Sequence, residues 1–142
     1  MLSKEEGVAE AARCWSRGFN CAESVLRGVC RVQVIELTDQ AMRMATPFGG
    51  GVGRSEDICG ALAGGVMAIG AAIGRTDVED DRLRSYEAAG KLHKSFCEEF
   101  GSSQCKVLNK SDFKSPEHRV RCGKFVEGAT RITIQILREK RT

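Results

Sequence analysis

Apolar residues recur at helical spacing along most of the chain. Val8, Ala11 and Trp15 form an apolar stripe that predicts a first helix, and this helix stops near Gly18. Asn20 is a favourable N-cap for a second helix. Further helices are predicted at residues 39–45, 58–74, 80–100 and 103–108, and from residue 116 towards the C-terminus. The pattern therefore predicts an all-α protein.

The helix predicted at residues 58–74 is unusual because it contains no charged residue. Gly60, Gly64, Ala68 and Ala72 recur every four residues, so one face of this helix carries almost no side chains. A membrane span needs about 20 strongly apolar residues, whereas this run is mostly Gly and Ala. We therefore expect no membrane span, but a central Gly/Ala-rich helix buried in a single-domain helical bundle that covers residues 1–142.

Composition and charge fit one globular domain. The 142 residues are 42% hydrophobic and 29% charged, which is enough for one core. The net charge is only +3 and basic residues are scattered among acidic ones, so no nucleic-acid partner is indicated. Residues 1–6 contain no apolar run typical of a secretory signal. We expect a cytoplasmic protein, whose thiols are kept reduced.

Seven cysteines lie in the chain, and no two of them form a Cys-x-x-Cys pair, so zinc-ribbon and thioredoxin-type motifs are absent. Cys21, Cys59 and Cys105 fall where a helix is predicted to begin. A helix N-terminus favours the thiolate, which is the reactive and metal-binding form of cysteine. Cys122 stands among three basic residues and Cys105 precedes a lysine. On charge alone, Cys122 and Cys105 are predicted to be the better attacking thiolates.

The other three cysteines, Cys14, Cys30 and Cys97, are predicted to lie within helices. Cys97 follows His93 by four residues, which is a spacing that places two metal ligands on one helical face. A histidine on an apolar face is more often a core residue, and we interpret His93 in this way. Cys14 and Cys30 are predicted to be packing residues.

A glycine-rich loop at residues 48–54 precedes Cys59. Its glycines do not have the Walker A spacing, because only three residues separate Gly49 from Gly53 and Arg54 follows instead of lysine. The simplest interpretation is that these glycines permit close backbone packing. Backbone N–H groups of the loop are also expected to line a small anion or substrate pocket beside Cys59.

Several motifs occur in a fixed order: GFNCA at residues 18–22, FGGG at 48–51 and CGALAG at 59–64, followed by Cys105 and Cys122. In these motifs the chain resembles the C_GCAxxG_C_C family, redox-active proteins named for four cysteines and a Cys-Gly-Ala-x-x-Gly motif. The resemblance implies that Cys21, Cys59, Cys105 and Cys122 are the family cysteines. It also implies that the remaining three cysteines lie outside the site.

Three functions follow from these cysteines. The first is redox chemistry, either thiol–disulfide exchange or electron transfer, with a redox partner or a small-molecule substrate. In thiol–disulfide exchange, one cysteine attacks and a second cysteine resolves the mixed disulfide. The second is binding of zinc or an iron–sulfur cluster by Cys21, Cys59, Cys105 and Cys122. The third is a non-catalytic homodimer that packs through the Gly/Ala helix or the glycine loop. Under either cysteine-based function, Cys59 is expected at the centre of the site.

Overall fold

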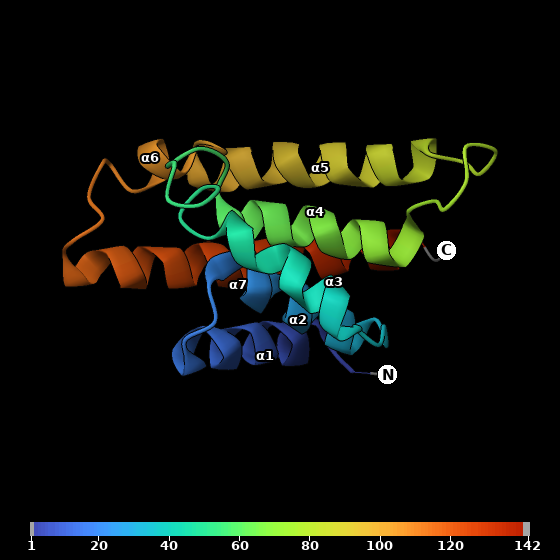
Figure 1. Cartoon of the computed structure of the whole chain (residues 1–142), viewed down its shortest axis with the longest axis horizontal. Helices are drawn as coiled ribbons and strands as arrows, with labels where there is room; N and C mark the ends of the chain where they lie inside the picture. The colour runs from blue at the N-terminus through green and yellow to red at the C-terminus, as the bar shows by residue number, and fades with distance from the viewer. Residues whose placement is uncertain (1, 141–142) are drawn as a thin grey trace.

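The computed structural model describes residues 2–140, which form an all-α bundle (Figure 1). Its helices are α1 (Lys4–Arg17), α2 (Cys21–Val32), α3 (Asp39–Ala45), α4 (Gly60–Ile73), α5 (Leu83–Phe100), α6 (Cys105–Leu108) and α7 (Pro116–Glu139). A 3₁₀ turn, Thr46–Phe48, follows α3. The prediction of an all-α single domain is confirmed.

Local capping explains where the first helices begin. The Ser3 hydroxyl accepts a hydrogen bond from the Glu6 N–H, and the Glu6 carboxylate accepts one from the Ser3 N–H. Asn20 and Glu23 form the same reciprocal capping box at the start of α2. Gly18 ends α1 at a φ of 108°, a left-handed conformation that suits glycine. These caps fix the short connection between α1 and α2, and so the position of Cys21.

The helices pack around α7, which contacts α1, α2, α4 and α5. Helix α2 lies between α1 and α4, and α5 packs on α4 and α7. Figure 1 shows α5 and α1 on opposite sides of the bundle, with α3 crossing in front. This arrangement brings the beginnings of α2, α4 and α6 to the same end of the molecule, so residues far apart in sequence meet there.

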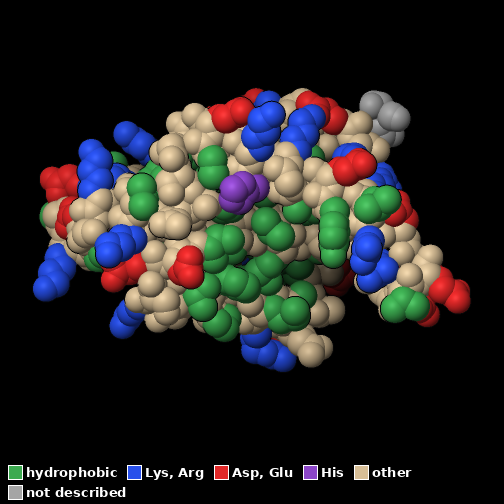
Figure 2. All heavy atoms as spheres, turned by 90° about the horizontal axis from the view of Figure 1, so that it is seen from above, with side chains coloured by type: hydrophobic (Ala, Val, Ile, Leu, Met, Phe, Trp, Pro, Cys, Tyr) green, Lys and Arg blue, Asp and Glu red, His purple; other side chains and the backbone are tan. Residues whose placement is uncertain are grey.

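Helix α4 is buried on one side only. Its Gly, Ala, Leu62 and Ile69 positions that face α2, α5 and α7 are buried, whereas Val66 and Gly70 are exposed. Helix α5 also exposes apolar side chains, Leu83 and Tyr86. Figure 2 shows apolar side chains gathered on the face seen from above, bordered by charged residues. Across residues 2–140, no helix combines the length and apolar character that a membrane crossing requires.

The inner face of α5 differs from the sequence prediction. The buried residues are Ala88, Leu92 and Phe96, whereas Tyr86 and His93 are exposed. The packing of α5 on α4 and α7 decides which of its side chains are buried. The interpretation of His93 as a core residue is therefore wrong. The pairing of His93 with Cys97 as metal ligands also finds no third ligand among residues 2–140.

Candidate functional site

One small cavity is lined by all four cysteines that the sequence singled out. It has a volume of about 100 Å³ and lies at the N-terminal end of α4. Its walls are Cys21, Cys59, Cys105, Cys122, Trp15, Asn20, Gly50, Gly60, Asn109, His118 and Phe125. All seven cysteines are free thiols, and Cys14, Cys30 and Cys97 do not line the cavity. We call this cavity the cysteine pocket.

Cys21 is the first residue of α2, and its N-cap Asn20 also holds the loop that covers it. The Asn20 side-chain amide donates a hydrogen bond to the Thr46 carbonyl at 2.8 Å. The Thr46 hydroxyl donates to the Glu23 carboxylate at 2.9 Å. One capping box therefore starts α2 and anchors the beginning of the glycine loop, which carries Gly50 to the pocket.

Two glycines of the CGALAG segment leave room for α2. A Cβ on Gly60 would overlap the Cys21 sulfur, so this sulfur rests directly on the backbone of α4. A Cβ on Gly64 would lie 2.5 Å from the Ala22 carbonyl oxygen. The close approach of α2 and α4 thus requires both glycines, and it places Cys21 next to Cys59 at the beginning of α4.

An isolated antiparallel bridge between Ile58 and Gln104 brings Cys59 and Cys105 together. The Cys59 N–H donates to the Ser103 carbonyl at 2.8 Å, and the Cys105 N–H donates to the Asp57 carbonyl. Cys59 is itself the N-cap of α4 and not a residue of its first turn. Cys105 is the first residue of α6, as its position in the sequence predicted to within one residue.

Asn109 links the other two cysteines. Its side-chain N–H₂ lies 3.8 Å from the Cys105 sulfur and donates to the Cys105 carbonyl at 3.1 Å. The Cys122 sulfur lies 3.8 Å from the Asn109 side-chain oxygen. Arg121 can only donate, so its Nε at 3.3 Å fixes which end of the amide is the oxygen. The amide therefore faces Cys105 with its donor and Cys122 with its acceptor.

The loop that carries Asn109 is tied to α7 by a charged contact. Arg121 forms an ion pair with Asp112 at 3.0 Å and also donates to the Asp112 carbonyl. The Ser115 hydroxyl and N–H, together with Arg121, hold the pKa of Asp112 well below its usual range. Asp112 therefore stays ionised at neutral pH and keeps Arg121 in place against Asn109.

Burial dominates the ionisation of the pocket. It raises the pKa of Cys59 and of Cys122 to about 12, and it also raises the pKa of Cys105 and Cys21. For Cys21, four backbone N–H groups oppose burial: its own and those of Ala22, Gly50 and Ala61. Ionised Cys21 in turn raises the pKa of each of the other three. Among the four thiols, Cys21 is the one with the most backbone N–H groups opposing the effect of burial on its pKa.

The expectation that basic residues make Cys122 a thiolate is wrong. Burial is the largest cause of its pKa shift, and the opposing charge of Arg121 is a small one. Arg121 already pairs with Asp112, and the Arg119 guanidinium lies over the Trp15 ring at 4.2 Å from its centroid. Lys124 is exposed. These basic residues are close to Cys122 in sequence, but in the structure their side chains pair with Asp112, lie over Trp15 or are exposed.

The glycine loop supplies fewer free N–H groups than its composition indicated. Backbone carbonyls within residues 46–52 accept the N–H groups of Gly49, Val52, Gly53, Arg54, Ser55, Glu56 and Asp57. Gly50 is the loop residue whose N–H acts on Cys21. Gly50 lines the pocket together with Cys59, so the loop borders the site as expected. It does so through one N–H group, that of Gly50, which acts on the Cys21 sulfur.

The positions of the four cysteines do not match what a metal ion needs. In the part of the chain that the structure describes, no three His, Cys, Asp or Glu side chains are placed so that they hold one ion. A tetrahedral zinc site requires four ligands at about 2.0–2.3 Å from the metal. The four cysteines as they lie do not form such a site, and we derive no chemistry through a metal.

Comparison with known sequences agrees with the pocket. A family profile described as "Putative redox-active protein (C_GCAxxG_C_C)" matches residues 19–136, which include all four pocket cysteines. The chain belongs to the C_GCAxxG_C_C family. The family description supports a redox-active protein, and the matched range includes the four cysteines that line the pocket.

A relative of this family member is found in Archaeoglobus fulgidus (strain ATCC 49558 / DSM 4304 / JCM 9628 / NBRC 100126 / VC-16). It is 31% identical over 134 residues, covers 87% of each chain and is described as "Uncharacterized protein". No solved structure matches the chain. The comparisons therefore establish the family, and the chemistry must be argued from the pocket.

Several residues of the C_GCAxxG_C_C site were not found by sequence reasoning. The sequence pattern assigns no role to Asn109 or His118, although both line the pocket. The bridge between Ile58 and Gln104 leaves no pattern in the sequence, because it consists of one isolated pair. The CGALAG motif is the signal that pointed to close packing at Gly60.

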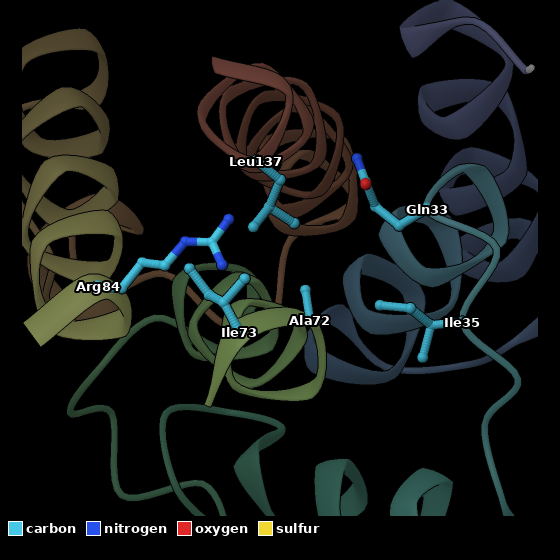
Figure 3. A pocket seen from close by; sticks show the side chains of 6 residues that line it. All are labelled: Gln33, Ile35, Ala72, Ile73, Arg84 and Leu137. Carbon is cyan, nitrogen blue, oxygen red and sulfur yellow. The ribbon is translucent and has the colours of Figure 1, made fainter. Parts of the chain in front are cut away.

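A second cavity of the family member lies at the other end of α4 and has a volume of about 300 Å³. Figure 3 shows Arg84 reaching in beside Ile73, with Leu137 above it and Gln33 on the opposite side. Its walls include no cysteine. Chemistry that depends on the family cysteines therefore belongs to the cysteine pocket.

Proposed function

We propose that the cysteine pocket carries out thiol–disulfide exchange, with Cys21 as the attacking thiol and Cys59 as the resolving thiol. The observation that carries this proposal is that all four cysteines line one pocket, with the Cys21 sulfur against the α4 backbone at Gly60. Backbone N–H groups from α2, α4 and the glycine loop also oppose the effect of burial on the pKa of Cys21. The Ala61 N–H acts on both Cys21 and Cys59, which supports a pairing of these two sulfurs. Family membership supports redox activity in general.

The order of the steps follows from the charges. The Cys21 thiolate attacks one sulfur of a disulfide, forms a mixed disulfide and releases the other half as a thiolate, which takes up a proton from water. The negative charge has then left Cys21, so it no longer raises the pKa of Cys59. Cys59 ionises more readily at this stage and attacks the Cys21 sulfur. The substrate is reduced by two electrons, and Cys21 and Cys59 become a disulfide.

Cys105 and Cys122 form a second dithiol in the same proposal. The Asn109 amide presents a donor to the Cys105 sulfur and an acceptor to the Cys122 thiol. A donor favours the thiolate and an acceptor favours the protonated thiol, so the amide gives the two sulfurs different roles. We assign Cys105 as the member of this pair that attacks the Cys21–Cys59 disulfide. This exchange regenerates two thiols and leaves a Cys105–Cys122 disulfide.

The test is a count of thiols during oxidation and reduction. Reduced protein, purified anaerobically, should lose two thiols on mild oxidation and regain them with dithiothreitol. Cys21→Ser should abolish this fast loss, whereas Cys97→Ser, on α5 and outside the pocket, should retain it. An equal thiol count after oxidant and after reductant would contradict the proposal. Stoichiometric zinc or iron in the purified protein would favour the metal-binding function instead.

A second function, self-association, is favoured by the exposed side of α4. We infer that two copies pack through this face, because Val66 lies on it and the adjoining α5 exposes Leu83 and Tyr86. Light scattering should give the mass of a dimer, and Val66→Lys should give the mass of a monomer. Val107→Lys, at an exposed valine on α6, is the control and should leave the dimer intact. A monomeric wild-type protein would refute this inference.

The family member is proposed to work in the cytoplasm. Thiols are kept reduced in that compartment, and lasting disulfides are rare there. A pocket that begins each cycle as free thiols suits those conditions, and all seven cysteines are free in this structure. Measuring the thiol redox state of the protein in cells by rapid alkylation tests the assignment. A pocket found fully oxidised in growing cells would contradict it.

A further inference from the structure

A wide groove adjoins the cysteine pocket. It has a volume of about 1000 Å³ and shares Asn20, Gly50 and His118 with the pocket. Cys59 and Cys105 are only 5% and 6% exposed, so a reaction partner must approach the sulfurs through an adjoining opening. The three shared residues make the groove one approach to the cysteine pocket.

The charged side chains of the groove are mainly basic. Arg54 projects from the glycine loop and Lys114 from the loop before α7, and both line the groove. Within residues 2–140, neither takes part in an ion pair. Glu56 is the acidic residue of the lining. Two cations against one anion give the groove a net positive charge, which attracts an anionic ligand.

The position of Arg54 links this charge to the reacting sulfur. A Cβ on Gly50 would lie 3.0 Å from the Arg54 side chain, so Arg54 packs directly beside Gly50. The Gly50 N–H acts on Cys21. Gly50 lines both the groove and the cysteine pocket, so the Arg54 side chain begins at the boundary between the two.

The remaining lining offers apolar contact. Phe113 and His118 pack edge to face with their ring centroids 5.3 Å apart, and both line the groove with Pro47. The His118 ring also lines the cysteine pocket, so it stands at the boundary between the two spaces. A small ligand with an aliphatic middle and charged ends matches apolar walls flanked by cations.

We propose that the groove binds a small disulfide bearing carboxylate groups, and that Arg54 and Lys114 hold the carboxylates while the disulfide reaches Cys21. This assignment rests on the proposed thiol–disulfide function. The Cys21 thiolate displaces one half of the disulfide, which leaves as a thiol after protonation, and Cys59 then displaces the second half. The ligand gains two electrons and two protons, and Cys21 and Cys59 form a disulfide.

Three symmetrical disulfides of different charge test this proposal. Reduced protein is treated anaerobically with the dianion 3,3′-dithiodipropionate, the neutral 2-hydroxyethyl disulfide and the dication cystamine, and the loss of protein thiols is followed. Each rate is divided by the rate of the same disulfide with a small thiol, which removes intrinsic reactivity. We expect the normalised rates to fall in the order dianion, neutral, dication, and the preference for the dianion to weaken with added salt.

Variants assign the preference to the two cations. Arg54→Gln and Lys114→Gln should each lower the ratio of the dianion rate to the neutral rate about twofold to fivefold, as expected for exposed charges. Lys94→Gln, at an exposed lysine on α5 away from the groove, should leave the ratio unchanged. A ratio unaffected by both groove variants overturns the groove assignment. Failure of all three disulfides to oxidise the pocket overturns the thiol–disulfide function itself.

Discussion

Replacing Gly64 by alanine tests the close packing of α2 on α4 that positions Cys21. The new Cβ would lie 2.5 Å from the Ala22 carbonyl oxygen and 3.0 Å from its Cα. These are backbone atoms, so no side-chain rotation relieves the overlap and the two helices must separate. Overpacking of this kind costs about 1–3 kcal/mol. Alanine also gains about 0.5–1 kcal/mol over glycine inside a helix, and this gain must be separated from the overlap.

Gly70→Ala is the matched control, because it makes the same change in the same helix where a Cβ would meet nothing within 4 Å. Its helix-propensity gain should appear in full. Urea unfolding of both reduced variants, followed by circular dichroism, gives their free energies of unfolding. We expect Gly64→Ala to be less stable than Gly70→Ala by about 1–3 kcal/mol. Equal stability of the two variants would refute the close-packing account of the motif.

Two further predictions concern the site and the buried thiols. Asn109→Leu removes the side-chain hydrogen bonds to the Cys105 carbonyl and from the Arg121 Nε, each worth about 0.5–1.5 kcal/mol, so we expect the free energy of unfolding to fall by about 1–3 kcal/mol. Gln40→Leu, at an exposed amide, is the control and should show no loss. Equal stability of the two variants would argue against the amide bridge. Burial raises the pKa of Cys30 from 9.0 to about 12. Between these two pH values the thiol ionises only in the unfolded protein, so the free energy of unfolding falls as the pH rises. Cys30→Ala should therefore flatten the fall in unfolding free energy between pH 9 and 11 by up to about 1.4 kcal/mol per pH unit, and an unchanged slope would contradict the raised pKa.

Much of the fold was predictable because the helix signals are local. Asn20 caps α2 with its own side chain, and Gly18 ends α1 by its backbone conformation, so neighbouring residues decide both boundaries. The inner face of α5 was not predictable in the same way. His93 and Leu92 are adjacent, and the direction in which α5 meets α4 and α7 decides which is buried. That direction is a property of the assembled bundle.

The meeting of these four cysteines could be predicted from the sequence, whereas the causes of their pKa shifts could not. Helix starts and the family motif pointed to Cys21, Cys59, Cys105 and Cys122, which share one pocket. Cys59 was expected at the centre, whereas Cys21 is the thiol whose ionisation acts on all the others. Burial and the N–H groups around each sulfur set the pKa values, and both come from contacts between distant segments.

Peptide mapping of the oxidised protein tests the central claim most directly. Fully reduced protein is oxidised anaerobically with one equivalent of diamide, quenched with an alkylating agent, digested and analysed by mass spectrometry. The account predicts a disulfide between Cys21 and Cys59, or between Cys105 and Cys122 after internal exchange, with Cys14, Cys30 and Cys97 alkylated as free thiols. Alkylated Cys21 together with disulfides among the three cysteines outside the pocket would contradict it.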